Sequence, residues 1–254
     1  KLLSHCRRQL DIDKIKIPDR VYLLADDIFD EMVSRNVGEY RYPLGGKLYV
    51  FNKNENIGFI KGHMCSPAIA TQAEDLIAGG VKELIHVGYA GGLQPELVPG
   101  EIILTDGAFN DTAVARLYGY DYDIIHSSKD LTNEIEEMIT SAEILYKRGI
   151  HWTTDAGYRE TWGQVMDYRD KGALCVEMEG VGLFTIANYR KCVATGIYVV
   201  SDKGTRYEIV GKGDVINTIE PKNQGLQTII IYRQNEDGTW NYKNNVFRVG
   251  SELD

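Results

Sequence analysis

The chain reads Leu174-Cys175-Val176-Glu177-Met178-Glu179-Gly180 and, further on, Tyr198-Val199-Val200-Ser201-Asp202. On an extended segment Glu177 and Glu179 share one face, and Met178 takes the other. A helix that begins at this point has an apolar stripe with which to pack, formed by Val181, Phe184, Ala187 and Tyr189. The second stretch is rich in β-branched residues and predicts a strand that ends at the Ser-Asp pair.

The two stretches are expected to meet at one edge of a sheet. In open α/β sheets, ligands bind outside the carboxyl ends of the strands. Neighbouring elements would therefore bring Glu177, Glu179 and Asp202 to one crevice. Each acid taken alone also has a structural explanation, because acids favour helix starts and an Asp after a strand often caps the next helix.

Predicted strands and helices alternate along the chain. The apolar patterns predict strands over 20–24, 47–51, 57–60, 84–87, 101–105 and 195–200. They predict helices over 27–33, 68–78 and 133–147. Gly79-Gly80 is expected to end the second helix, and Thr132 to cap the third. This order predicts one α/β domain over residues 1–254, with a twisted, largely parallel central sheet flanked by helices.

Two segments read as β-hairpins. The polar run 52–56 separates two of the predicted strands. Near the end of the chain, Thr228–Tyr232 and Trp240–Val249 flank an Asp-Gly pair, Asp237-Gly238, which is typical of a tight hairpin turn. The second segment predicts a C-terminal β-hairpin.

Composition excludes some classes of protein. The chain has 254 residues, 43% of them hydrophobic, which is typical of a globular domain with a sizeable core. A net charge of -9 argues against a nucleic-acid partner. No apolar run has membrane-spanning length, and no secretory signal opens the chain. The four cysteines lack paired metal-ligand spacing, so we expect no metal, no membrane partner and a reducing, cytoplasmic location.

Several motifs together resemble the nucleoside phosphorylase family, which includes hexameric purine nucleoside phosphorylases, uridine phosphorylases and related nucleosidases. The match covers roughly residues 20–205 in the family's order, whereas residues 206–254 diverge from the helix with which the family usually ends. The motifs that carry the resemblance are Arg41–Gly45, Gly62–Pro67, Gly88–Leu93, Pro99–Leu104, Val176–Glu179 and Val200–Asp202.

The resemblance implies cleavage of a nucleoside's N-glycosidic bond through a transition state that is similar to an oxocarbenium ion. Glu179 is then expected to accept hydrogen bonds from the ribose hydroxyls and to offset the positive charge. Met178 and Met64 are expected to pack against the sugar. Asp202 is expected to protonate the departing base, although Lys203 beside it would favour the ionised carboxylate.

The segment 152–161 aligns with the family's base-site loop. The family's stacking aromatic corresponds to Gly157 here, so the resemblance implies other base-binding candidates, namely Thr154, Tyr158, Arg159 and Glu177. Glu177 has an alternative role in holding the backbone. Trp152 is expected to lie in the core, since tryptophans are heavily buried.

The phosphate side departs most from the family. His86 replaces an arginine and Tyr89 replaces a small hydroxyl residue, in a predicted glycine turn that starts at Gly88 and passes through 91–92. The loop after the first strand, 25–27, is acidic. Arg41 matches an arginine that reaches the site from a neighbouring subunit, and it also fits a solvated surface position.

The resemblance implies a pentosyltransferase of nucleotide salvage that produces free base and ribose 1-phosphate. It implies a cytoplasmic homo-oligomer, a dimer or a hexamer, with phosphate as co-substrate and no cofactor. Two alternatives stay open: a nucleosidase that uses water, activated by one acid in segment 26–31, and a non-catalytic nucleoside-binding protein. A dinucleotide-binding fold is disfavoured, because no glycine follows the first strand. The motifs do not choose between purine and pyrimidine.

Overall fold

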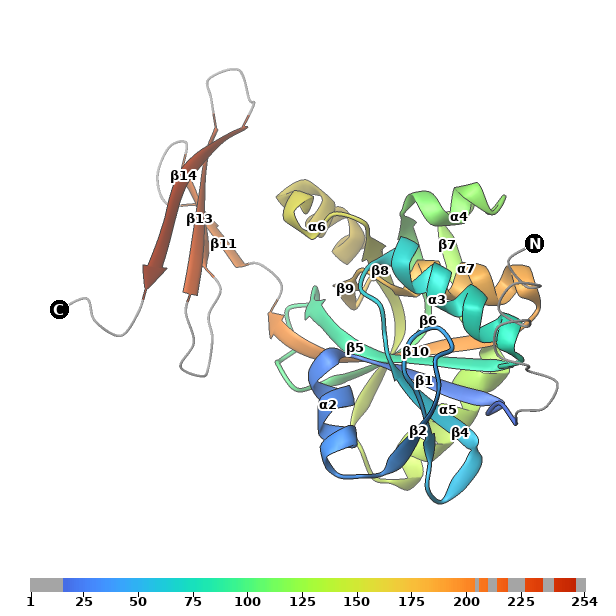
Figure 1. The fold of residues 1–254 in the computed structure, drawn as a ribbon. Helices are drawn as coiled ribbons and strands as arrows, with labels where there is room; N and C mark the ends of the chain where they lie inside the picture. Colours follow the sequence, from blue (N-terminus) through green and yellow to red (C-terminus); the bar gives the residue numbers. More distant parts are fainter. Residues whose placement is uncertain (1–15, 204–205, 210–213, 219–226, 235–239, 250–254) are drawn as a thin grey trace.

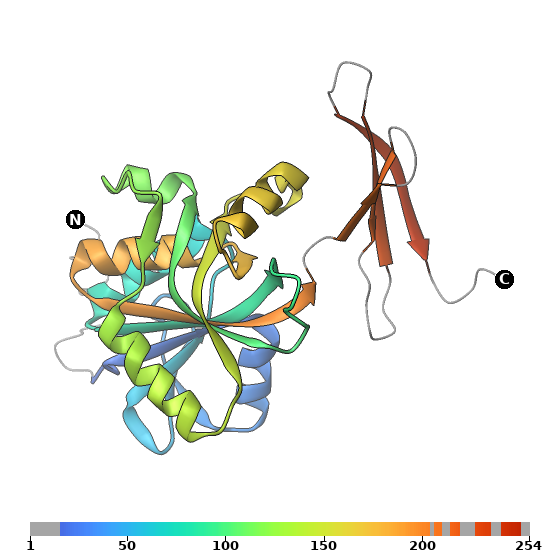
Figure 2. The ribbon, with the colours of Figure 1, turned by 180° about the vertical axis from the view of Figure 1, so that it is seen from behind.

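The computed structural model describes residues 16–203, 206–209, 214–218, 227–234 and 240–249. It contains two sheets, a large mixed sheet and a four-stranded antiparallel sheet (Figures 1 and 2). The strands of the large sheet are β1 (Arg20–Leu24), β2 (Gly38–Tyr42), β3 (Leu48–Phe51), β4 (Asn54–Lys61), β5 (Glu83–Gly92), β6 (Ile102–Asp111), β7 (Ile124–His126), β8 (Tyr146–Thr154), β9 (Cys175–Glu177) and β10 (Val193–Lys203).

Helices cover both faces of the large sheet (Figure 1). Helices α3, α4 and α7 pack together on one face, and their apolar side chains form the largest buried cluster. Helix α5 covers β6 and β10 on the other face, while α2 packs on β4. The bounds are α2 (Asp26–Ser34), α3 (Ser66–Gly79), α4 (Ala113–Leu117), α5 (Lys129–Ser141), the 3-10 turn η2 (Gly157–Arg159), α6 (Trp162–Asp170) and α7 (Gly180–Arg190).

The large sheet closes on itself in part. Its strand order is β10-β6-β8-β9-β5-β1-β4-β3-β2, and β10 also pairs with β5. Strands β5, β10, β6, β8 and β9 therefore form a ring, which gives this half of the sheet a barrel-like closure. Because β6–β10, β5–β9 and β3–β4 are antiparallel, the sheet is mixed, and the expectation of a largely parallel sheet is corrected.

Most of the predicted elements are confirmed. The first strand and the helix that ends at Gly79-Gly80 appear as expected. The predicted hairpin also forms, but its turn is shorter than 52–56 because β4 begins at Asn54. Gly80 follows that helix with a φ of 120°, a conformation that suits glycine. The third predicted helix is misplaced: α5 begins after Ser128 and ends at Ser141. Thr132 lies inside this helix, buried and hydrogen-bonded to Thr195, rather than at its cap.

The predicted glycine turn is wrong. Strand β5 continues through Gly88 to Gly92, and none of its glycines has a positive φ. Gly91 pairs with Val176 of β9 on one side and with Asp202 of β10 on the other. The glycines therefore extend a central strand into the site.

The C-terminal segment forms the four-stranded antiparallel sheet, drawn in orange to red in Figure 1. Its strands are β11 (Arg206–Ile209), β12 (Asp214–Thr218), β13 (Gln227–Gln234) and β14 (Trp240–Val249). The predicted C-terminal hairpin corresponds to β13 and β14, which pair antiparallel. The Asp-Gly turn between them lies outside the described residues.

Candidate active site

Glu177 closes the turn between β9 and α7. One of its carboxylate oxygens, Oε2, accepts hydrogen bonds from the backbone N–H groups of Glu179 and Gly180, both at 2.8 Å. These N–H groups lie at the start of α7, where a helix leaves its donors without internal partners. Glu177 thus satisfies the helix start and fixes the backbone that carries Glu179.

The other oxygen of Glu177 faces two buried side chains of β8. Oε1 accepts from His151 Nε2 at 3.0 Å and from the Thr153 hydroxyl. Burial by itself would raise the pKa of Glu177, but the charge and hydrogen bond of His151, with Thr153, outweigh it and lower the pKa. The Glu177 side chain has no exposed surface. This geometry favours its role in holding the backbone over contact with a base.

Glu179 lies in a different environment, half-buried at the cap of α7. Its Oε1 accepts from the backbone N–H of Cys65 at 2.7 Å, and its Oε2 accepts from that of Met178 at 3.3 Å. Burial and the negative charge of Glu177 raise the pKa of Glu179 to about 7. Two acids that are two residues apart therefore have opposite pKa shifts, which is typical of sites where neighbouring carboxyl groups have separate tasks.

The loop after β4 packs against this turn. The hydroxyl of Ser66 donates to the carbonyl of Met178 at 2.9 Å. A side chain at position 182 would meet the backbone of Ser66 at 2.5 Å, so Gly182 permits the close approach of α3 and α7. Met178 is partly buried beside Glu179, whereas Met64 in the loop is 75% exposed. The predicted sugar-side residues therefore gather around one open edge.

Asp202 reaches the same region along β10. Its backbone pairs with Gly91, which pairs on its other side with Val176, the residue before Glu177. The side chains of Asp202 and Lys203 lie outside the described part of the structure. The strand pairing therefore places the end of β10 on one side of Gly91 and the start of the Glu-Met-Glu turn on the other.

The phosphate-side residues offer little positive charge. His86 is buried, and burial lowers its pKa to about 4, so its ring is neutral near pH 7. Its ring lies over Gly88, where an added Cβ would approach Cε1 to 2.9 Å. The Tyr89 hydroxyl donates to Asp27 Oδ2 at 2.6 Å, which ties β5 to the acidic start of α2.

Lys61 and Arg41 each pair with an acid. Lys61 Nζ lies 2.7 Å from Asp26. Arg41 is exposed on β2 and pairs with Glu39 at 3.0 Å. Within one chain, Arg41 therefore occupies a surface position.

The segment predicted to border the base, 152–161, has some residues buried in the core and others exposed to solvent. Thr154 is buried at the end of β8, while Tyr158 is 95% exposed and Arg159 is also exposed in η2. A side chain at Gly157 would lie 3.7 Å from Met178 Sδ, so this loop borders the sugar-side residues. Trp152 is fully buried and stacks on Tyr168 with ring centroids 4.4 Å apart, which confirms its core position.

Sequence reasoning missed a buried polar layer beneath the two acids. His151 also contacts the Thr105 hydroxyl through Nδ1 at 2.6 Å, and its ring packs on Tyr198 with centroids 4.8 Å apart. The alternation of His151, Trp152 and Thr153 was a usable signal, because residues two apart on a strand face the same side. Two polar residues on that face required a polar partner, which is Glu177.

A metal is not required to explain the cluster. His86, Glu177 and Glu179 place potential ligand atoms within 4.8 Å of one another. Each Glu177 oxygen, however, already accepts two hydrogen bonds. The arrangement therefore favours hydrogen bonding over metal coordination.

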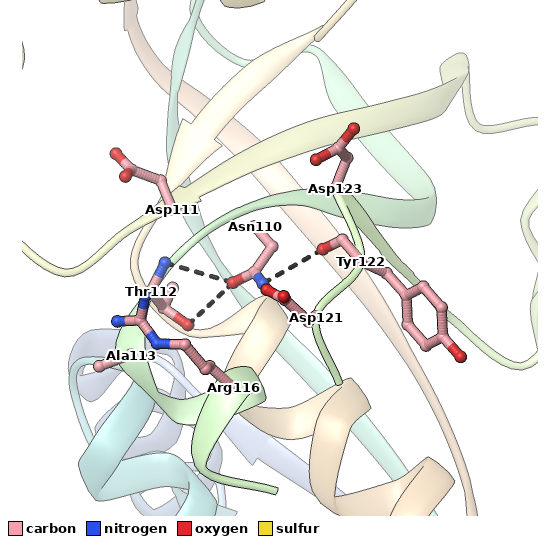
Figure 3. Close-up of a pocket in the computed structure, with 8 residues that line it drawn as sticks. All are labelled: Asn110, Asp111, Thr112, Ala113, Arg116, Asp121, Tyr122 and Asp123. Carbon is pink, nitrogen blue, oxygen red and sulfur yellow. Dashed lines mark hydrogen bonds between the residues drawn. The ribbon is translucent and has the colours of Figure 1, made fainter. Parts of the chain in front are cut away.

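A separate pocket of about 360 Å³ opens between the end of β6, α4 and the segment that precedes β7 (Figure 3). Asn110 organises it by accepting from the N–H of Thr112 and donating to the carbonyl of Tyr122. None of the predicted site residues lines it. Its lining residues are Asn110–Ala113, Arg116 and Asp121–Asp123.

The sequence of the chain is similar to those of known proteins. Over 188 residues, the chain is 29% identical to a purine nucleoside phosphorylase DeoD-type from Exiguobacterium sibiricum, covering 73% of this chain and 78% of that protein. A protein of the same description from Exiguobacterium sp. is 30% identical over 188 residues, with 73% and 77% covered. One from Shewanella oneidensis, described as DeoD-type 1, is 27% identical over 195 residues, with 75% and 80% covered.

A family model adds a wider match. The model described as the phosphorylase superfamily matches residues 17–222, which include the Glu-Met-Glu turn and the end of β10. The chain therefore belongs to the phosphorylase superfamily.

Proposed function

We propose that this protein cleaves the N-glycosidic bond of a purine nucleoside by phosphorolysis, giving free base and ribose 1-phosphate. The observation that carries the proposal is the turn between β9 and α7. There the buried carboxylate of Glu177 accepts the backbone N–H of Glu179, whose own side chain is half-buried. Membership of the phosphorylase superfamily and the names of the curated relatives support the reaction and the purine base.

Glu179 acts on the sugar. As the glycosidic bond breaks, positive charge develops on the ribose ring. An ionised carboxylate fixed beside the ring stabilises that charge without reorganisation. Met178 and Met64 pack against the sugar, and Asp202 delivers a proton to the departing base. Thr154, Tyr158 and Arg159 border the base.

Phosphate requires a cation, and we assign this task to Arg41 of a second copy of the chain. Arg41 is exposed, and Tyr40 beside it is 49% exposed, so β2 is free to meet another subunit. The proposal requires at least a two-fold symmetric homo-oligomer. A monomer in light scattering at assay concentration would remove Arg41 from the site.

A nucleosidase is the second candidate. The hydrogen bond from Tyr89 to Asp27 favours it, because it places a carboxylate where the family binds phosphate. Like charges at about 4 Å repel by roughly 1 kcal/mol in water and by more when partly buried. In this case Asp27 activates water, and the product is free ribose.

The proposed function needs no cofactor besides phosphate, and we place the protein in the cytoplasm. Cys65, Cys175 and Cys192 are free thiols, which fits a reducing compartment. Within the described residues, no helix is both long and apolar enough to cross a membrane.

The test is a panel of inosine, guanosine, adenosine, uridine and thymidine with added phosphate, followed by release of free base. The proposal predicts cleavage of at least one purine nucleoside. No release of base from inosine, guanosine or adenosine would overturn it.

A further inference from the structure

We infer that His151 is a positioning residue for the proposed cleavage, because it holds Glu177, which in turn fixes the backbone of Glu179. The inference rests on the proposed function for its catalytic meaning. Its structural basis is a continuous set of buried contacts from β6 to the start of α7.

His151 is locked in place on β8. The residue is fully buried. Its Nε2 lies 3.0 Å from Glu177 Oε1, and its Nδ1 lies 2.6 Å from the Thr105 hydroxyl. The ring also packs against Tyr198 and Phe184, with centroids 4.8 Å and 6.2 Å away. Both ring nitrogens thus have partners, and rotation of the ring would break both contacts.

Thr105 keeps this contact in either protonation state of the ring. When Nδ1 is unprotonated, the Thr105 hydroxyl donates to it. When Nδ1 carries a proton, it donates to the same hydroxyl, which can then donate to the carbonyl of Gly107 at 2.8 Å. Nε2–H donates to the carboxylate of Glu177 both in the neutral ring that carries its proton on Nε2 and in the ring that is protonated on both nitrogens.

Glu177 links the hydrogen bond from His151 to the backbone of Glu179. Its Oε2 accepts from the N–H groups of Glu179 and Gly180, so a shift of the Glu177 side chain moves the turn. The Glu179 side chain then moves out of line with the backbone N–H of Cys65, from which it accepts a hydrogen bond at 2.7 Å. His151 acts on the reaction only through this chain of contacts, which is why it is a positioning residue.

Substitution of Gly180 provides a second, independent way to disturb the contact between His151 and Glu177. A Cβ at this position would lie 2.5 Å from His151 Nε2 and 3.1 Å from Glu177 Oε1. The φ of Gly180 is not in the positive region, so its backbone conformation does not itself require glycine. The close approach of the His151 ring explains why a residue without a side chain occupies position 180.

The experiment compares His151→Leu with His151→Gln in the full-length protein. Leucine fills similar space but donates nothing to Glu177, whereas a glutamine amide can reach it and donate. We expect His151→Leu to lower kcat by about 10-fold or more with little change in KM, because a transition-state interaction is weakened. We expect His151→Gln to stay within about 3-fold of wild type, since the hydrogen bond is restored.

Tyr146→Phe is the matched control. Tyr146 begins the same strand β8, and its part-buried hydroxyl donates to Glu136 Oε1 at 2.9 Å, at the opposite end of the strand from Thr153 and its partner Glu177. Its loss should lower Tm and leave kcat unchanged.

Gly180→Ala serves if His151→Leu fails to fold. The added methyl should displace the ring and lower kcat in the same way. In a His151→Ala background, the same methyl should cost much less, because the two residues contact each other.

The outcomes separate this inference from the proposed function. If wild-type protein releases no base, the proposed function fails, and a catalytic role for His151 fails with it. If wild type is active but folded His151→Leu is equally active, only the positioning role is overturned. Equal losses in His151→Leu and His151→Gln would also overturn it, because the restored donor would then have no effect.

Discussion

The backbone N–H of Cys65 donates to Glu179 Oε1 at 2.7 Å, so the loop after β4 and the start of α7 meet at one carboxylate. Cys65 adopts a φ of 72°, an unusual conformation for a residue with a side chain. The contact orients Glu179 while leaving it partly exposed. The site therefore presents an acid at its edge whose orientation is fixed by a backbone hydrogen bond.

Replacing Glu179 with glutamine should lower turnover by roughly 100-fold or more, because the transition state loses its charge partner. The amide keeps the size of the side chain, so the fold should survive. Turnover is measured by base release at saturating nucleoside. Near-normal turnover in a folded Glu179→Gln protein would remove Glu179 from the catalytic residues.

Glu74→Gln is the control for that substitution. Glu74 bonds Arg190 at the far end of α7, at 2.7 Å, and also accepts from Tyr118. This carboxylate lies away from the turn, so its loss should affect stability and leave turnover near wild type.

Stability should fall as pH rises through the range in which Glu179 ionises. The pKa of Glu179 is raised from 4.5 to about 7, first by burial and then by the charge of Glu177. Between these values the folded protein holds a proton that the unfolded chain has released. The free energy of unfolding is therefore highest below the ordinary value and decreases up to about pH 7.

Urea unfolding at several pH values checks this sign. Glu179→Gln removes the titrating group, so its stability should decrease less than that of wild type over the same range. The pKa of Glu177 is lowered, so its own contribution changes only at more acidic pH. Parallel stability curves for the two proteins would show that Glu179 titrates normally.

Asp202→Asn should damage cleavage of natural nucleosides far more than cleavage of a nitrophenyl riboside. The nitrophenolate departs without a proton, whereas a purine requires one. The two substrates are compared through kcat/KM. Equal losses on both would indicate that Asp202 has a structural task at the end of β10.

Gly157→Phe should restore a stacking ring over the base. A side chain at this position would begin 3.6 Å from Glu160 and 3.7 Å from Met178, which are ordinary contact distances. Aromatic pairs contribute about 0.5–1.5 kcal/mol, so KM for a purine nucleoside should fall by about 3-fold. Gly163→Phe on exposed α6 is the control and should leave KM unchanged. An unchanged KM in both variants would place the base elsewhere.

Local patterns in the sequence identified the elements that carry the site. The β-branched run before Asp202 appears as β10, and the apolar stripe after Glu179 appears as α7. The extended geometry expected for the two acids ends at Glu177, because Glu179 already has helical backbone angles. The spacing of apolar residues and the β-strand propensity thus located both elements, but they did not predict the turn at Glu177–Glu179.

Long-range pairing was not predictable in the same way. The strand order, the ring closure through β5 and β10, and the antiparallel placement of β9 depend on contacts between distant residues. Gly91 and Gly92 looked like a turn, since nothing local shows that two strands pair with them. The role of His151 cannot be read from local sequence for a related reason, because its partner Glu177 lies 26 residues away.

The sugar product of purine nucleoside cleavage distinguishes phosphorolysis from hydrolysis. Wild-type protein is incubated with inosine in saturating phosphate and ¹⁸O-labelled water, and the sugar is identified by mass. Phosphorolysis predicts ribose 1-phosphate without label from water. Labelled free ribose as the sole sugar product would contradict phosphorolysis and assign the protein to hydrolysis.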